Sequence, residues 1–187
     1  MMAYHGIVIA GFGGQGVMLM GQLIATAAML EGKHSTWFPS YGPEMRGGTA
    51  NCTVVVDEKP IASPVVETPT EVVAMNYPSM MKFGRVLKSG GYLFINSSVI
   101  HETLDRKDIK LIPVPVNDIA DRIGNLKVAN VVMLGAFLEL TKTVGFKSVE
   151  EALREKLTGR KSALLDYNLR ALEEGAKYVR KSMSTVG

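Results

Sequence analysis

Apolar residues follow two spacings along this chain. Residues 6–10 form a short β-branched run that ends in glycines, which is typical of a buried parallel strand, and residues 17–30 follow with helical composition. Further short apolar runs predict strands at 36–38, 52–56, 72–75, 92–95 and 111–116. The first of these is expected to stop at Pro39, and residues 61–62 could return as a hairpin.

Helical periodicity dominates the second half of the chain. Helices are predicted at 79–88, 118–123, 129–141 and 162–181, and another after the capping box Ser148-Val149-Glu150-Glu151. Strands and helices that alternate in this way favour a three-layer α/β architecture, αβα, with a mainly parallel central sheet that could be mixed. No repeat or linker interrupts residues 1–187, so one domain is expected.

Composition narrows the function classes. The chain has 187 residues, 47% of them hydrophobic and 21% charged, which excludes disorder as its dominant state. A net charge of +3 spread along the sequence argues against a nucleic-acid or membrane-surface protein. The single cysteine, Cys52, cannot close an internal disulfide, build a Cys-rich zinc site or ligate an iron–sulfur cluster. Any redox chemistry must therefore use a centre in another chain.

The first thirty residues lack Asp, Glu, Lys and Arg, as a signal peptide or a membrane span might. Two features reject both interpretations. No basic segment precedes the apolar run, and glycines from Gly11 to Gly16 interrupt it before it reaches the roughly 18 residues that a span needs. We therefore expect a cytoplasmic protein with no membrane segment.

A glycine-rich turn follows the first strand. Gly11, Gly13, Gly14, Gln15 and Gly16 belong to a G-x-G-x-x-G segment that opens the first helix, where unpaired backbone N–H groups suit a phosphate. A dinucleotide site would also need an acidic residue roughly 20 positions further on. The second strand supplies none, since Glu31 comes too early and Glu44 too late. The glycines could instead only permit close packing, or the turn could approach a phosphate-bearing ligand, transiently or from another subunit.

The second candidate site is the polar segment 40–51. Its members are Tyr41, Gly42, Glu44, Arg46, Gly47 and Gly48. If the sheet is parallel there, this loop leaves the same sheet edge as the glycine turn. Arg46 either pairs with Glu44 or offers its planar donor fork to a phosphate or carboxylate. Tyr41 and Trp37 are interpreted as packing residues rather than stacking platforms.

These two segments together resemble the gamma subunit, or gamma domain, of the 2-oxoacid:ferredoxin oxidoreductases. The resemblance rests on residues 11–16 and 40–48 in this order, with 127–130 and 134–137 in the late helix, and it covers essentially the whole chain. Residues 49–52, the turn at 60–64 and 75–76 look most like the separate gamma subunit of 2-oxoglutarate enzymes; the pyruvate and ketoisovalerate relatives remain alternatives.

The resemblance implies a function and a set of partners. The complex would convert a 2-oxoacid and coenzyme A into an acyl-CoA (succinyl-CoA from 2-oxoglutarate), CO2 and reduced ferredoxin or another acceptor. Thiamine diphosphate and the iron–sulfur clusters would lie in alpha and beta subunits, or in a ferredoxin-like delta subunit. This chain would bind no cofactor alone and would be inactive alone, with coenzyme A as a shared ligand near Arg46. When isolated, it could form a homodimer through its partner surface.

The remaining polar residues give weaker indications of function. His5, His34 and His101 lack partners at ligand spacing and are interpreted as surface or loop residues; neither a metal site nor a catalytic residue is expected. Asn130 is polar inside an uncharged helix and must find a partner if it is buried. The alternatives to a gamma subunit are a stand-alone NAD(P)- or flavin-binding enzyme and a non-enzymatic module that binds phosphorylated ligands.

Overall fold

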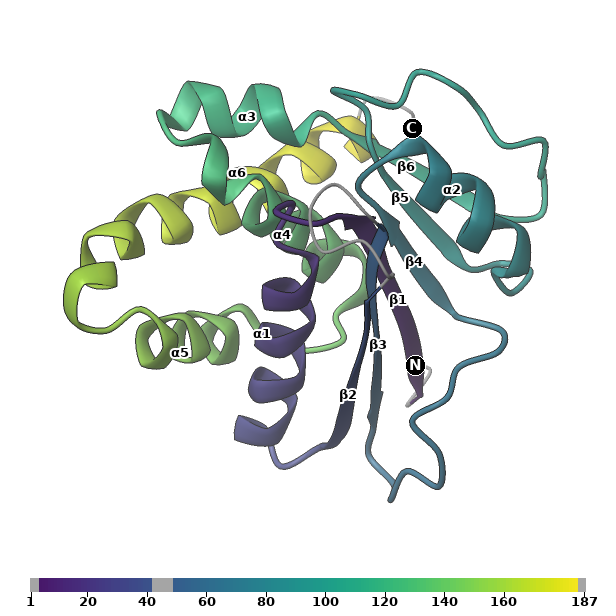
Figure 1. Ribbon diagram of the computed structural model, residues 1–187, viewed down its shortest axis with the longest axis horizontal. Coiled ribbons are helices and arrows are strands. Elements are labelled where there is room, and N and C mark those ends of the chain that lie inside the picture. The colour runs from purple at the N-terminus through teal and green to yellow at the C-terminus, as the bar shows by residue number, and fades with distance from the viewer. Residues whose placement is uncertain (1–3, 42–48, 185–187) are drawn as a thin grey trace.

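The computed structural model describes residues 4–41 and 49–184, and all of its strands within those ranges belong to one mixed sheet (Figure 1). The elements are β1 (His5–Phe12), α1 (Val17–Leu30), β2 (His34–Tyr41), β3 (Thr49–Asp57), β4 (Glu71–Ala74), α2 (Tyr77–Phe83), β5 (Tyr92–Asn96), β6 (Lys110–Val114), α3 (Val116–Ile123), α4 (Ala129–Thr141), α5 (Phe146–Lys156) and α6 (Leu165–Ser184). The predicted α/β class is confirmed.

Strand order in the sheet is β2-β3-β1-β4-β5-β6. The strands β1, β4, β5 and β6 are parallel neighbours, whereas β3 runs antiparallel to both β1 and β2. The sheet is therefore parallel over four strands and antiparallel at one end. Because β3 reverses direction between them, β1 and β2 point the same way.

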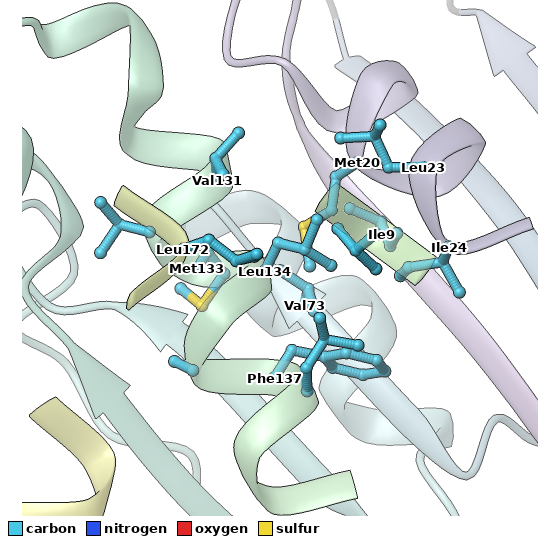
Figure 2. Packing of buried hydrophobic residues seen from close by; sticks show 14 of the residues in the cluster. Ile9, Met20, Leu23, Ile24, Val73, Val131, Met133, Leu134, Phe137 and Leu172 are labelled. Atoms are coloured by element: carbon cyan, nitrogen blue, oxygen red, sulfur yellow. The ribbon is translucent and has the colours of Figure 1, made fainter. Parts of the chain in front are cut away.

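Helices cover the two faces of the sheet unequally (Figure 1). One face packs against α1, α3, α4, α5 and α6, and the other packs against α2 and the segment that follows β5. Figure 2 shows how the larger core is built: side chains from α1, β1, β4, α4 and α6 meet in one cluster around Leu134 and Phe137. The centroids of the Phe137 ring and of the Phe94 ring in β5 lie 5.3 Å apart. Three layers result, as the alternating pattern predicts.

The helices α4 and α6 make an unusually close contact. A methyl group at Gly135 of α4 would overlap the Leu172 carbonyl, and one at Gly175 of α6 would overlap the Val132 carbonyl. Each glycine therefore lets the backbone of the other helix approach directly. Since Leu172 and Val132 are themselves buried, this contact forms part of the core that supports the start of α4.

Three strand predictions are wrong in detail. The strand β2 continues through Pro39, because β2 is the edge strand and pairs only with β3, and an edge strand tolerates a proline. The predicted loop, 40–51, accordingly loses Ser40 and Tyr41 to β2 and residues 49–51 to β3. Residues 61–62 form no return strand, because β1 and β2 already occupy both edges of β3.

The capping box at Ser148 is also wrong. The helix α5 begins three residues earlier than that capping box would place it, at Phe146, and Gly145 is its N-cap. The carboxylate of Glu31, at the end of α1, accepts the Gly145 N–H at 2.5 Å and so does the capping from another element. Burial opposes ionisation of Glu31, but hydrogen bonds from Lys33, Gly145 and Ser148 together hold its pKa below the ordinary value. A local motif could not reveal this long-range cap.

Candidate functional site

The glycine turn lies between the end of β1 and the start of α1. Gly14 and Gly16 have φ values of 92° and 74°, in the left-handed region that glycine tolerates best. The side chain of Gln15 closes the turn, because its Oε1 accepts the Phe12 N–H at 2.7 Å while its own backbone N–H donates to the Phe12 carbonyl at 3.2 Å. The turn thus has one defined shape rather than being a loose linker.

Two amide side chains tie this turn to neighbouring elements. Gln15 Nε2 donates to the Met75 carbonyl just after β4 at 3.1 Å. Asn130, at the start of α4, donates from Nδ2 to the Gly16 carbonyl at 3.1 Å and is only 4% exposed. The prediction that a buried Asn130 must find a partner is confirmed. The start of α1 is held from two sides by residues far away in the sequence.

The sheet has a topological switch point at this turn. After β1 the chain crosses to the α1 face, whereas after β4 it crosses to the α2 face, so the two connections diverge between adjacent parallel strands (Figure 1). Ligand sites of open α/β sheets form in the crevice at such a point. A cavity of about 200 Å³ lies there, and its lining includes Gly14, Gln15, Asn117, Lys127 and Asn130. We call it the switch-point crevice.

Charge and backbone geometry suit this crevice to an anion. The helix α1 begins without a side-chain cap and without an acidic residue in its first turn. Its first N–H groups and the positive end of its dipole are therefore available to an anion. The exposed Lys127 adds a full positive charge, and none of the residues that line the crevice is acidic. The arrangement can hold one phosphate or carboxylate group.

Only part of the predicted site falls within the described residues. Gly11 lies in β1, Gly13, Gly14, Gln15 and Gly16 form the turn between β1 and α1, and Tyr41 ends β2. Gly11 and Tyr41 both pair with Ala50, so these two strand ends lie at the same sheet edge, although an antiparallel strand separates them. The predicted site residues Gly42, Glu44, Arg46, Gly47 and Gly48 lie outside the described residues.

A polar network beside the crevice was missed by sequence reasoning. Asn96, which ends β5 and is fully buried, donates from Nδ2 to Asn117 Oδ1 at 3.1 Å. Its own Oδ1 accepts the Ser98 N–H, and the Ser98 hydroxyl donates to Asp118 at the start of α3. An available signal was that Asn76, Asn96 and Asn117 each come shortly after a predicted parallel strand. Polar residues at such positions point to the carboxyl edge of the sheet.

The structure also bears on the dinucleotide alternative. In that fold an acidic residue on the neighbouring strand holds the ribose. Here the strand next to β1 on that side is the antiparallel β3, and β2 is displaced by one position and carries no Asp or Glu. The glycine turn is thus present without the strand arrangement that a dinucleotide ribose requires.

The cysteine and the histidines are placed as follows. Cys52 is fully buried in β3, its thiol faces the Val17 carbonyl, and burial raises its pKa to about 12. His34 and His101 are exposed as expected. The expectation for His5 is wrong, because its side chain is only 12% exposed and bonds Glu71, 66 residues away. Within residues 4–41 and 49–184, no cluster of three His, Cys, Asp or Glu could hold a metal ion, and no helix is long and apolar enough to cross a membrane.

Known proteins similar to this chain agree with the geometry. Residues 6–178 match the family described as pyruvate ferredoxin/flavodoxin oxidoreductase. Ketoisovalerate oxidoreductase subunit VorA of Methanothermobacter thermautotrophicus is 40% identical over 95% of this chain, which spans only 37% of VorA. The 2-oxoglutarate synthase subunit KorC of the same organism is 34% identical over 92% of this chain and 94% of its own length.

A solved structure extends this likeness to three dimensions. The gamma subunit of a keto/oxoacid ferredoxin oxidoreductase from Geobacter sulfurreducens superimposes with a TM-score of 0.83 at 27% identity, over 93% of this chain and 95% of that one. The fold, the extent of the family match and the identity to full-length relatives point the same way. The chain therefore belongs to the pyruvate ferredoxin/flavodoxin oxidoreductase family.

Proposed function

We propose that this chain is the gamma subunit of a 2-oxoacid:ferredoxin oxidoreductase and acts only within that complex. Family membership supports this, as does end-to-end similarity to KorC and to the Geobacter gamma subunit, both close to this chain in extent. In VorA the similar region is about a third of a longer polypeptide. Alpha and beta subunits would supply thiamine diphosphate and the iron–sulfur clusters.

The switch-point crevice supports a role toward coenzyme A, the one substrate of such an enzyme that carries phosphates. A volume of about 200 Å³ is below the range of about 300–1,000 Å³ that holds a whole ligand, so the crevice fits a single phosphate group. A methyl group at Gly14 would meet no atom within 4 Å, which leaves the backbone open on the ligand side. The observation that carries the proposal is this open, uncapped start of α1 beside Lys127.

Each residue of the crevice would have a distinct role in binding the phosphate. The first N–H groups of α1 would bind the phosphate, and Lys127 would balance its charge. Gln15 and Asn130 would position the turn through their bonds to Met75 and Gly16. None of these groups abstracts a proton or attacks a carbonyl, so the decarboxylation itself would take place in the partner subunits.

We further propose 2-oxoglutarate as the 2-oxoacid. Its support is that KorC aligns over nearly its full length with nearly all of this chain. A second candidate is ketoisovalerate, favoured by the higher identity to VorA. Activity of the assembled enzyme with 2-oxoglutarate, ketoisovalerate and pyruvate in turn would decide between them.

The proposed contact with coenzyme A has a direct test. Lys127→Ala, assembled with its partner subunits, should raise the KM for coenzyme A about tenfold, as loss of a charged hydrogen bond does, and leave kcat near its original value. Arg46→Ala should act in the same direction. Lys161→Ala, which removes an exposed lysine outside the crevice, is the matched control. An unchanged KM in Lys127→Ala would count against the contact.

A further inference from the structure

A second cavity lies at the opposite edge of the sheet, where the parallel strands begin. Its volume is about 560 Å³, and we call it the amino-edge cavity. His5 opens β1, and Glu71, Tyr92 and Lys110 open β4, β5 and β6 in one register row. The segment Thr141–Thr143 at the end of α4 closes over them. Gly11 lies six positions along β1 from His5, which places the cavity about 20 Å from the glycine turn.

Buried polar groups form the floor of this cavity. Glu71 is 2% exposed, and His5 Nδ1 donates to its Oε1 at 2.9 Å. A second partner is Thr70, whose hydroxyl donates to Glu71 Oε2 and accepts the Gly6 N–H at 2.9 Å. Thr143 Oγ1 lies 3.3 Å from the same His5 nitrogen. With both of its oxygens satisfied, Glu71 needs no cation from the cavity to offset its burial.

Lysines dominate the rim. Lys33, Lys110 and Lys142 line the cavity, against the carboxylates of Glu58 and Glu71. Lys33 is already engaged, since its Nζ lies 2.8 Å from both the Thr143 carbonyl and Glu31 Oε2. The Lys110 ammonium stands 4.6 Å above the Tyr92 ring and 3.4 Å from the Tyr92 hydroxyl. The Lys142 ammonium pairs with Glu139 at 3.3 Å, but the Lys142 side chain is 61% exposed, and an exposed pair of this kind holds its lysine weakly. Both ammonium groups can therefore still turn to an anionic ligand.

The backbone at Lys142 is an independent observation. Among the described residues it is the only non-glycine with a positive φ, 53°. It ends α4 in the left-handed conformation that glycine usually supplies at this position. A lysine here costs backbone strain that a glycine would avoid, and such strain is typically kept where the side chain serves a function. The strained residue also lines the cavity.

We propose that the amino-edge cavity is a binding site for a small organic anion, a carboxylate or a phosphate ester, held by Lys110 and Lys142. The cavity volume falls within the range of small-molecule sites. This site is separate from the switch-point crevice and does not depend on the function proposed above.

An NMR titration of the full chain tests the proposal. The probes are inorganic phosphate, succinate and the uncharged succinamide. Saturable shifts of the His5 ring and of the Thr141–Thr143 amides are expected with phosphate or succinate, and the probe that binds more tightly identifies the anion class. Absence of saturation with both anions up to about 10 mM, or equal binding of succinamide, would overturn the proposal.

Three variants localise the site. Lys110→Ala should weaken binding of the anionic probe about tenfold, because a charged hydrogen bond is lost. Lys142→Gly should weaken it similarly while keeping the fold, since glycine prefers this backbone conformation. Lys161→Ala, an exposed lysine outside the cavity, is the control and should bind like the unmodified chain. Unchanged binding in both Lys110→Ala and a folded Lys142→Gly would contradict the assignment.

Discussion

Replacement of Gly16 by alanine tests whether the glycine turn is held by Asn130. A Cβ at Gly16 would lie 2.5 Å from Asn130 Nδ2, so the amide would have to leave the Gly16 carbonyl. Gly14 provides a matched comparison in the same turn. It also has a positive φ, but a Cβ there would meet nothing within 4 Å.

The magnitudes follow from these two environments. An alanine in the left-handed region costs about 1–2 kcal/mol, and this applies to both positions. Gly16→Ala also breaks a hydrogen bond of a buried amide, which adds about 1–3 kcal/mol. The expected losses of unfolding free energy are therefore about 1–2 kcal/mol for Gly14→Ala and about 2–5 kcal/mol for Gly16→Ala. Effects of the added methyl on the unfolded chain are the same for both variants and cancel in the comparison.

Urea unfolding of the two variants, with and without Asn130→Ala, measures these differences. In the Asn130→Ala background the side-chain amide is gone and only the Cβ of residue 130, 3.0 Å from the new methyl, remains, so Gly16→Ala should cost little more than the backbone strain of about 1–2 kcal/mol. Gly14→Ala should cost the same in both backgrounds. Equal costs for Gly14→Ala and Gly16→Ala in the unmodified chain, or a Gly16→Ala cost that Asn130→Ala does not reduce, would refute the reasoning.

Three further predictions concern the support of the fold. Gly135→Ala should lower the free energy of unfolding in urea by about 3 kcal/mol, because the added methyl overlaps the Leu172 carbonyl. At an exposed helical site the same substitution would raise the free energy of unfolding by up to about 1 kcal/mol. A stabilised Gly135→Ala variant would therefore contradict the close contact between α4 and α6. Cys52, with a pKa raised by burial to about 12, should react with iodoacetamide at pH 8 only when urea unfolds the chain, and reaction of the folded chain would contradict its burial. Arg106→Ala should speed hydrogen exchange in residues 104–109, because Arg106 donates hydrogen bonds to the Gly84 and Leu87 carbonyls and to Asp108. The hydrogen bond from Arg106 also lowers the pKa of Asp108. In the unmodified chain the protection from exchange should therefore be complete above the ordinary pKa range of Asp and be lost as pH falls through the lowered pKa.

Local sequence patterns predicted the elements that local physics determines. The bounds of α1 and α4 agree with the expected 17–30 and 129–141, since a glycine turn precedes the first and an uninterrupted apolar stretch makes the second. The turn itself was also predictable, because its spacing and its position after a buried strand are both visible in the sequence. The sequence also predicted that a buried Asn130 needs a hydrogen-bond partner, but it did not indicate that this partner is the Gly16 carbonyl.

Long-range pairing accounts for what the sequence could not predict. No local sequence pattern indicates that β3 inserts antiparallel between β1 and β2. This insertion places β2 at the sheet edge, where the strand can continue through Pro39. The pairing of His5 with Glu71 and the capping of α5 by Glu31 join residues more than sixty positions apart. Such contacts follow from the topology of the sheet, and they placed a largely buried His5–Glu71 hydrogen bond where only a surface histidine was expected.

Reconstitution of the complex is the direct test of whether this chain works only as a subunit of a 2-oxoacid:ferredoxin oxidoreductase. The assay follows coenzyme A-dependent reduction of a viologen dye by the partner alpha and beta subunits, by this chain alone, and by all of them together, with 2-oxoglutarate as substrate. Full activity is expected only for the complete mixture, and none for the chain alone. Full activity of the partners without this chain, or turnover by the chain alone, would contradict it.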